Sequence, residues 1–225
     1  MARYNLFGQI HKALRSMLYD MALTLQQTNF VNSEAAEISL EKLQQVLDVL
    51  DKHTENEDNF ILPAIQQYEP SLTDAFFQMH SDDREMAEKI NKSINEFYKA
   101  GKDEEKLNTG ALIKKTFTEF MDSSIQHMNS EESVLNKVLW KYYSDSEIMI
   151  LNHRTSKSPT EDTTSFRNWV IRGLSNTEIV GLMKAIGKNA PDFVFNSLLA
   201  IAEKELPGFR YDQVIERLSK EALVA

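Results

Sequence analysis

Four long stretches of the chain carry apolar residues at alternating steps of three and four positions, which is the spacing of one face of an α-helix. The inner stripes run over 7–21, 43–64, 76–97 and 113–138. Turn-forming residues separate them at 29–33, 69–71 and 101–103. Because helices joined by such short loops pack as antiparallel neighbours, the pattern predicts an all-α fold, an antiparallel up-down four-helix bundle over residues 1–145.

The same spacing continues through the later halves of the second and fourth stripes. It makes Phe60 and Val134 inner positions of the predicted core. Pro63 lies inside the second stripe, and a proline there removes a backbone donor and predicts a kink.

After about residue 145 the pattern changes. Residues 153–162 are polar and read as a linker, and 158–161 resemble a capping box with proline at the first helical position. Ser175 and Glu178 form a second capping box. We therefore expect 146–225 to be a C-terminal annex of three or four short helices. Its apolar residues, such as Trp169 and Leu198, predict that it packs on the bundle.

The composition of the chain limits which metal ligands and which partners are possible. The chain has no cysteine, which excludes disulfides, iron–sulfur clusters and thiolate zinc sites, so a metal would need nitrogen and oxygen ligands. The net charge is −9 and no basic stripe occurs, so nucleic acid is not an expected partner. No apolar run reaches the ~18 residues of a membrane span. The N-terminal residues lack a signal-peptide core, so we expect a cytoplasmic protein without a membrane partner.

Four of the five histidines fall one per stripe, on inner positions, and the fifth, His153, lies in the polar segment. The four are His11, His53, His80 and His127. Glutamates follow two of them at the fourth residue, Glu57 after His53 and Glu131 after His127. Side chains four residues apart share one helix face, about 5–6 Å apart at Cβ, so each pair can reach one metal site.

The six side chains are expected at one depth. In antiparallel helices, residues at equal depth lie equally far from the turn between them. Residue 32 is midway between His11 and His53 and falls in the first turn, and the midpoint of His80 and His127 falls beside the third. Two buried carboxylates without compensation would cost several kcal/mol each. Metal coordination removes that cost, so we predict that all six residues converge on one metal site.

This set of residues closely resembles the hemerythrin-like, or HHE cation-binding, domain over about residues 5–140. The resemblance rests on the isolated His11 and His80 and on the segments HTENEDNFILPAI and HMNSEESVL. It implies a di-iron centre in which the histidines are terminal ligands and the two glutamates bridge the metals. Imidazole and carboxylate also suit manganese and zinc, which remain alternatives to iron.

One position departs from the oxygen-carrying hemerythrins, which present a further histidine four residues after the histidine of the third helix. Here that residue is Arg84, which is not a ligand. Asp83 lies on the inner stripe and is an alternative ligand, or else a carboxylate paired with arginine or solvent. We expect Arg84 to point outward, because long arginine side chains reach water.

Two function classes remain open. The first is a binding or sensing protein for oxygen, nitric oxide or iron, with a homodimer as a further option. The second is a di-iron oxidoreductase acting on oxygen, peroxide or nitric oxide. Because the sequence supplies no substrate pocket or electron partner, the first is favoured. A degenerate bundle with an empty site is the third interpretation.

Overall fold

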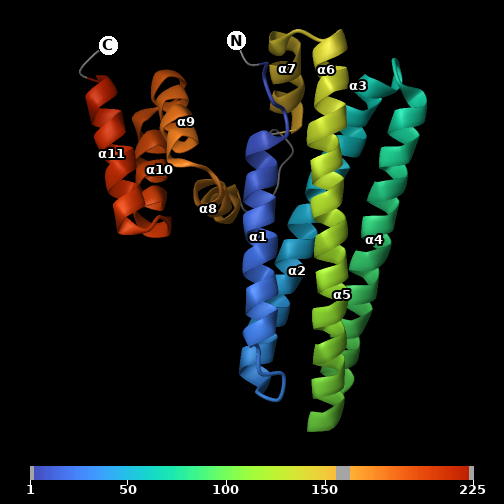
Figure 1. Ribbon diagram of the computed structural model, residues 1–225. Helices are drawn as coiled ribbons and strands as arrows, with labels where there is room; N and C mark the ends of the chain where they lie inside the picture. Colours follow the sequence, from blue (N-terminus) through green and yellow to red (C-terminus); the bar gives the residue numbers. More distant parts are fainter. Residues whose placement is uncertain (1–2, 156–162, 223–225) are drawn as a thin grey trace. The chain divides into compact units, whose positions relative to one another are not determined.

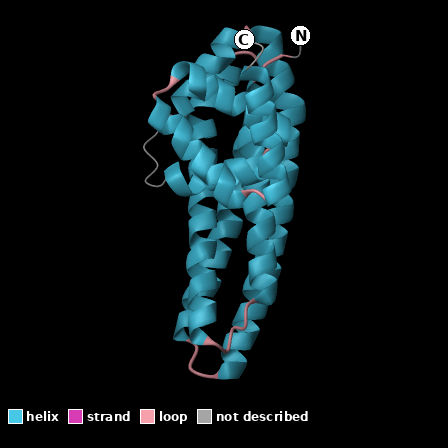
Figure 2. Cartoon of the chain, turned by 90° about the vertical axis from the view of Figure 1, so that its left-hand side faces the viewer, coloured by secondary structure: helices cyan, strands magenta, loops and turns pink. Residues whose placement is uncertain are grey.

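The computed structural model describes residues 3–155 and 163–222, and within these ranges every regular element is helical (Figures 1 and 2). The prediction of an all-α fold is confirmed for this part of the chain. None of its helices is both long and apolar enough to cross a membrane. The predicted capping box at 158–161 lies outside the described residues.

Four long helices begin and end close to the predicted turns. They are α1 (Gly8–Gln27), α2 (Ser33–Asn56), α4 (Pro70–Lys99) and α5 (Asp103–Ser130). Asn32 caps α2, since its side chain accepts a hydrogen bond from the Ala35 N–H. α4 packs along α5 and α2 packs against α4. The up-down order of the four helices stays a prediction from the sequence.

Two of the long helices continue through a π-helical turn. α2 passes into η1 (Glu57–Ile61) and then α3 (Leu62–Gln66), while α5 passes into η2 (Glu131–Leu135) and then α6 (Asn136–Tyr142). Each π turn begins at a predicted ligand. The Leu62 N–H donates to the Glu57 carbonyl and the Asn136 N–H to the Glu131 carbonyl, five residues back.

These π turns correct the predicted core beyond each glutamate. Ile61 is buried where the regular spacing predicted Phe60, and Leu135 is buried where it predicted Val134, which is 36% exposed. A π turn contains one residue more than an α turn, so every later position moves by one. Pro63 follows the irregular turn in η1, but η2 forms without a proline, so proline is not required for it.

Further helices complete the described chain. They are α7 (Asp145–Thr155), α8 (Thr163–Gly173), α9 (Asn176–Asn189), α10 (Asp192–Glu205) and α11 (Gly208–Ala222). The capping box at Ser175 and Glu178 opens α9, as the sequence indicated. The chain divides into two compact units, 1–8 with 17–160 and 9–16 with 161–225. The second unit has its own apolar core around Ile171, Met183 and Val214. Packing of 146–225 on the long helices stays a prediction.

Candidate metal centre

The six predicted side chains lie on the long helices and at the start of both π turns. His11 comes from α1, His53 from α2, His80 from α4 and His127 from α5, and the glutamates open η1 and η2. They form two groups in which one ligand atom from each residue lies within 4.8 Å of all the others. One group is His11, His53, Glu57 and Glu131, and the other is Glu57, His80, His127 and Glu131. Both glutamates belong to both groups.

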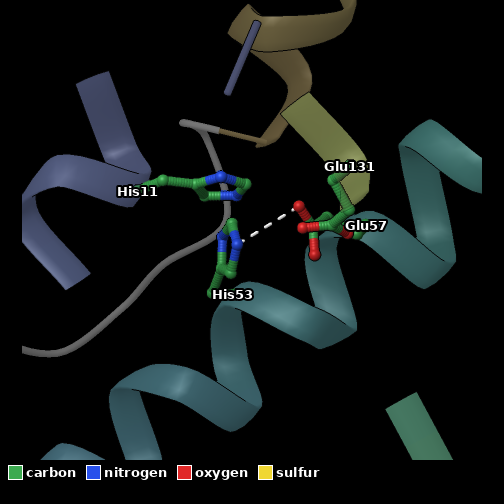
Figure 3. A group of neighbouring side chains, drawn as sticks. All are labelled: His11, His53, Glu57 and Glu131. Atoms are coloured by element: carbon green, nitrogen blue, oxygen red, sulfur yellow. Dashed lines mark ion pairs between the residues drawn. The ribbon is translucent and has the colours of Figure 1, made fainter. Parts of the chain in front are cut away.

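The first group brings two imidazole rings toward two carboxylates (Figure 3). His53 Nε2 lies 3.2 Å from Glu57 Oε1, which is the i, i+4 contact expected along one helix face. His11 and Glu131 are fully buried, so this group is shielded from solvent. The side chain of His53 keeps 14% exposure and is its most accessible member.

The second group is assembled by α4 and α5 with both π turns. His80 Nε2 lies 2.8 Å from His127 Nε2 and 3.6 Å from Glu131 Oε1. Glu57 Oε2 is 3.9 Å from the same His80 nitrogen, and His127 Nε2 is 3.0 Å from Glu131 Oε1. Two ring nitrogens and two carboxylates therefore surround a common point, as the ligands of one metal do.

The outer nitrogens of the second pair of histidines contact carboxylates. His80 Nδ1 lies 2.5 Å from Asp58 Oδ1, and His127 Nδ1 lies 3.0 Å from Asp83 Oδ2. A carboxylate that accepts the Nδ1–H leaves Nε2 with its lone pair toward the metal position. Asp83, an alternative ligand in the sequence, thus lies behind His127 and not in either ligand group. Sequence reasoning missed Asp58, whose only signal is its place beside Glu57.

Arg84 turns toward α2 and η1, with 40% of its side chain exposed, as its expected outward orientation requires. Its Nη2 donates to Asp58 Oδ2 at 2.6 Å, and its Nε donates to Asp51 Oδ1 at 3.3 Å. Burial alone would raise the pKa of Asp58, but the hydrogen bonds from His80 and Arg84 outweigh burial and hold that pKa below its ordinary value. Asp58 is therefore an anion between two donors.

Burial and mutual repulsion act on the ligand groups themselves. Burial first, and then the charge of Glu131, raises the pKa of Glu57 well above its ordinary value. Burial alone would lower the pKa of His127, but the hydrogen bonds to Asp83 and Glu131 outweigh it and raise this pKa to about 9. Both residues thus tend to hold protons that a metal must displace.

We expect metal binding near neutral pH to release at least one proton per chain. The pKa of His127 rises from 6.5 to about 9 in the metal-free fold, so its proton stabilises that fold below pH 6.5, and this stabilisation is lost as the pH rises through about 9. Metal affinity should therefore increase over that interval. Calorimetric titration with zinc in two buffers of different ionisation enthalpy measures the release.

Asp83→Asn is the matched variant for this titration. It weakens the hydrogen bond that holds the proton on His127, so it should release fewer protons than the unaltered chain. Equal heats in the two buffers, with no change in affinity between pH 6.5 and 9, would contradict the assignment.

A cavity of about 310 Å³ lies among α2, α4 and α5 and reaches the ligands. His53, His127 and Glu131 form part of its wall, and these residues come from both ligand groups. The rest of the lining mixes apolar side chains, among them Leu50, Phe120 and Met128, with charged ones such as Asp51, Arg84 and Glu88. The cavity gives a small molecule a place beside both ligand groups.

The donor set fits a pair of divalent metals. Each group offers two imidazoles and two shared carboxylates, and nitrogen with oxygen donors suits iron, manganese and zinc. The chain has no thiolate to favour a structural zinc site. Four protein ligands per metal would leave further coordination positions for an exogenous ligand, as reactive metals require.

Comparison with known proteins independently supports metal binding by this chain. The family model for the hemerythrin HHE cation-binding domain matches residues 3–139. F-box/LRR-repeat protein 5 of Xenopus tropicalis is 24% identical over 173 residues, which cover 73% of this chain and 25% of that protein. The Danio rerio protein of the same name is 22% identical over 189 residues, 80% of this chain and 26% of that protein. The chain thus spans about a quarter of these relatives, and no solved structure matches it.

Proposed function

Because the chain belongs to the hemerythrin HHE cation-binding family, we propose that it is a non-haem di-iron protein that binds or senses oxygen, nitric oxide or iron itself. The observation that carries this proposal is the pair of four-residue groups with Glu57 and Glu131 in common. Shared carboxylates are what a dinuclear centre needs, since each can bridge two metals. They also neutralise two of the four positive charges of an Fe(II) pair in a buried place.

The proposed ligand assignment follows the two groups. His11 and His53 would hold one iron and His80 and His127 the other, while Glu57 and Glu131 would bridge them. When bound, the iron pair would supply redox-active positions at which a diatomic ligand can be held. The chain's own contribution is to fix the rings of His80 and His127 through Asp58 and Asp83, and to place Leu50, Phe120 and Met128 in the wall of the adjoining cavity.

The cavity supports a small exogenous ligand. Its wall includes His53 of one group and His127 of the other, so a molecule inside lies beside both proposed metal positions. Leu50, Phe120 and Met128 make part of its wall apolar, which suits neutral diatomic molecules.

The volume of the same cavity supports a second candidate function. About 310 Å³ exceeds what a diatomic molecule needs and reaches the lower end of ordinary small-molecule sites, roughly 300–1,000 Å³. Charged groups such as Arg84 and Glu88 line it and could orient a polar molecule. A di-iron oxidoreductase that reduces oxygen, peroxide or nitric oxide is therefore the alternative.

Anaerobic loading with Fe(II) tests the proposal. We expect two irons per chain by metal analysis, and a change in the absorption spectrum on exposure to oxygen or nitric oxide. Reversal of that change on degassing supports binding or sensing, while sustained consumption of oxygen and a reductant supports the enzyme.

His153→Ala and His80→Ala are matched variants for this experiment. His153 is exposed on α7 and belongs to neither ligand group, so its loss should leave two irons. His80 is buried in the second group, and its loss should leave one iron or none. Fewer than two irons in the unaltered chain would contradict a di-iron centre and support a degenerate site.

A further inference from the structure

On the Nδ1 side of its ring, His80 is held by a chain of two residues outside the ligand groups, Asp58 and then Arg84. Its ring is fully buried, and its Nδ1 lies 2.5 Å from Asp58 Oδ1. The second oxygen of Asp58 accepts a hydrogen bond of 2.6 Å from Arg84 Nη2. His80 and Arg84 are four residues apart on α4 and so share one face of it, while Asp58 comes from η1. The carboxylate is thus inserted between a histidine and a residue one turn further along the same helix.

His127 is held in the same way. Its Nδ1 lies 3.0 Å from Asp83 Oδ2, and the other oxygen of Asp83 accepts a hydrogen bond of 2.7 Å from the Ser123 hydroxyl. His127 and Ser123 are again four residues apart, here on α5, and Asp83 comes from the neighbouring α4. Two carboxylates on different elements, Asp58 and Asp83, therefore make the same kind of contact with Nδ1 of the two histidines of one ligand group.

We propose that Asp58 and Asp83 are positioning residues that set the metal affinity at the position held by His80 and His127, and that Arg84 acts there only through Asp58. The inference rests on the proposed di-metal function and deepens it, because it assigns roles to residues that touch no metal. Arg84 reaches from the partly exposed surface to the histidine in two hydrogen bonds, so a surface substitution should alter a buried metal position.

The physical basis is the direction of the imidazole lone pair. A carboxylate that accepts the Nδ1–H fixes the tautomer and ring orientation, and it makes Nε2 a more basic ligand. Loss of such a partner commonly lowers metal affinity by ~10–100-fold. Arg84 in turn fixes the carboxylate of Asp58. Because Arg84 donates to one oxygen of Asp58 and His80 contacts the other, the carboxylate is held in one orientation.

The test is anaerobic titration with Fe(II) against a competing chelator, together with Mössbauer spectroscopy of the loaded protein. For Asp58→Asn we expect ~10–100-fold weaker binding of one of the two irons, and a change in the signal of that iron alone. Arg84→Gln should give a smaller loss at the same iron. Arg84→Gln added to Asp58→Asn should cause no further loss, since Arg84 acts through Asp58.

Asp82→Asn is the matched control. Asp82 lies on α4 beside Asp83, but it is exposed and accepts a hydrogen bond from Gln78, so both irons should bind as in the unaltered chain. Circular dichroism melting of each metal-free variant separates positioning from a loss of fold. If Asp58→Asn does not fold, the partly exposed Arg84→Gln carries the test.

Different results would contradict the positioning role of Asp58 and the proposed di-iron function. Two irons with unaltered affinity and spectrum in Asp58→Asn and Arg84→Gln would overturn the positioning role and leave the di-iron proposal standing. An equal loss of both irons in Asp58→Asn would also overturn it, since Asp58 contacts a histidine of only one group. Fewer than two irons in the unaltered chain would defeat the proposed function itself.

Discussion

Glu131→Gln is expected to abolish binding of both metals and, at the same time, to leave the metal-free protein as stable as before or more stable. Glu131 is fully buried and belongs to both ligand groups, so its loss removes a ligand from each metal. The affinity at both positions should fall by more than ~100-fold, beyond the effect of losing a supporting partner. Metal analysis after equilibrium dialysis measures the loss.

Electrostatics explain why Glu131→Gln should weaken metal binding without destabilising the metal-free protein. The charge of Glu131 contributes to the raised pKa of Glu57, so near neutral pH the metal-free fold holds a proton on Glu57 that the unfolded chain releases, and this proton uptake costs stability. A neutral amide of the same shape at position 131 lowers that cost, while His127 keeps its contact with Asp83. His53→Ala is the matched variant, because His53 belongs to one group and should cost one metal. Two metals retained by Glu131→Gln would show that Glu131 is no bridge.

Removal of the metals from the unaltered protein should lower its melting temperature by about 10 °C without unfolding it. A ligand present at 1,000 times its dissociation constant stabilises the folded state by ~4 kcal/mol. In a chain of this size each kcal/mol corresponds to roughly 2–4 °C. The metal-free protein should keep its helices, because apolar side chains of the long helices, such as Leu43, Ile94 and Ile113, are fully buried. A zinc finger, in contrast, has little core besides the metal.

Circular dichroism melting with and without a chelator gives the measurement. Glu131→Gln serves as the control, since a chain that binds no metal should melt at one temperature in both conditions. A metal-free protein with little helix would contradict the expectation, and so would a melting temperature that the chelator leaves unaltered.

The depth of the site could be predicted because it depends on quantities that the sequence contains. Helix lengths and turn positions place His11, His53, His80 and His127 at matching distances from the turns, and the structure brings each into a ligand group with Glu57 and Glu131. The rise of an α-helix and the antiparallel order of neighbouring helices are enough to predict a common depth, without any side-chain contact.

The core beyond the glutamates could not be predicted in the same way. Phe60 and Val134 satisfy the regular spacing, but Ile61 and Leu135 are the residues that the structure buries. A search for a period of 3.6 residues assumes an unbroken helix, and a π turn shifts the phase by one residue without leaving a sequence signal of its own.

The roles of the carboxylates of Asp58 and Asp83 could not be predicted for a different reason. Asp83 shares the inner stripe with true ligand candidates, and Asp58 is adjacent to one, so the sequence does not distinguish a ligand from a group behind a ligand. That distinction depends on which nitrogen of His80 or His127 the carboxylate reaches from a neighbouring element.

The two π turns also bear on how such a centre could be transplanted. Each extra residue rotates the helix beyond the glutamate by about 100° relative to an uninterrupted α-helix. The ligand-bearing half and the core-packing half of one helix can therefore face directions that a straight helix would not allow. A designer who copies His53, Glu57, His127 and Glu131 onto ideal helices would turn the following apolar faces away from their partners. One residue inserted after each glutamate would bring those faces back into register.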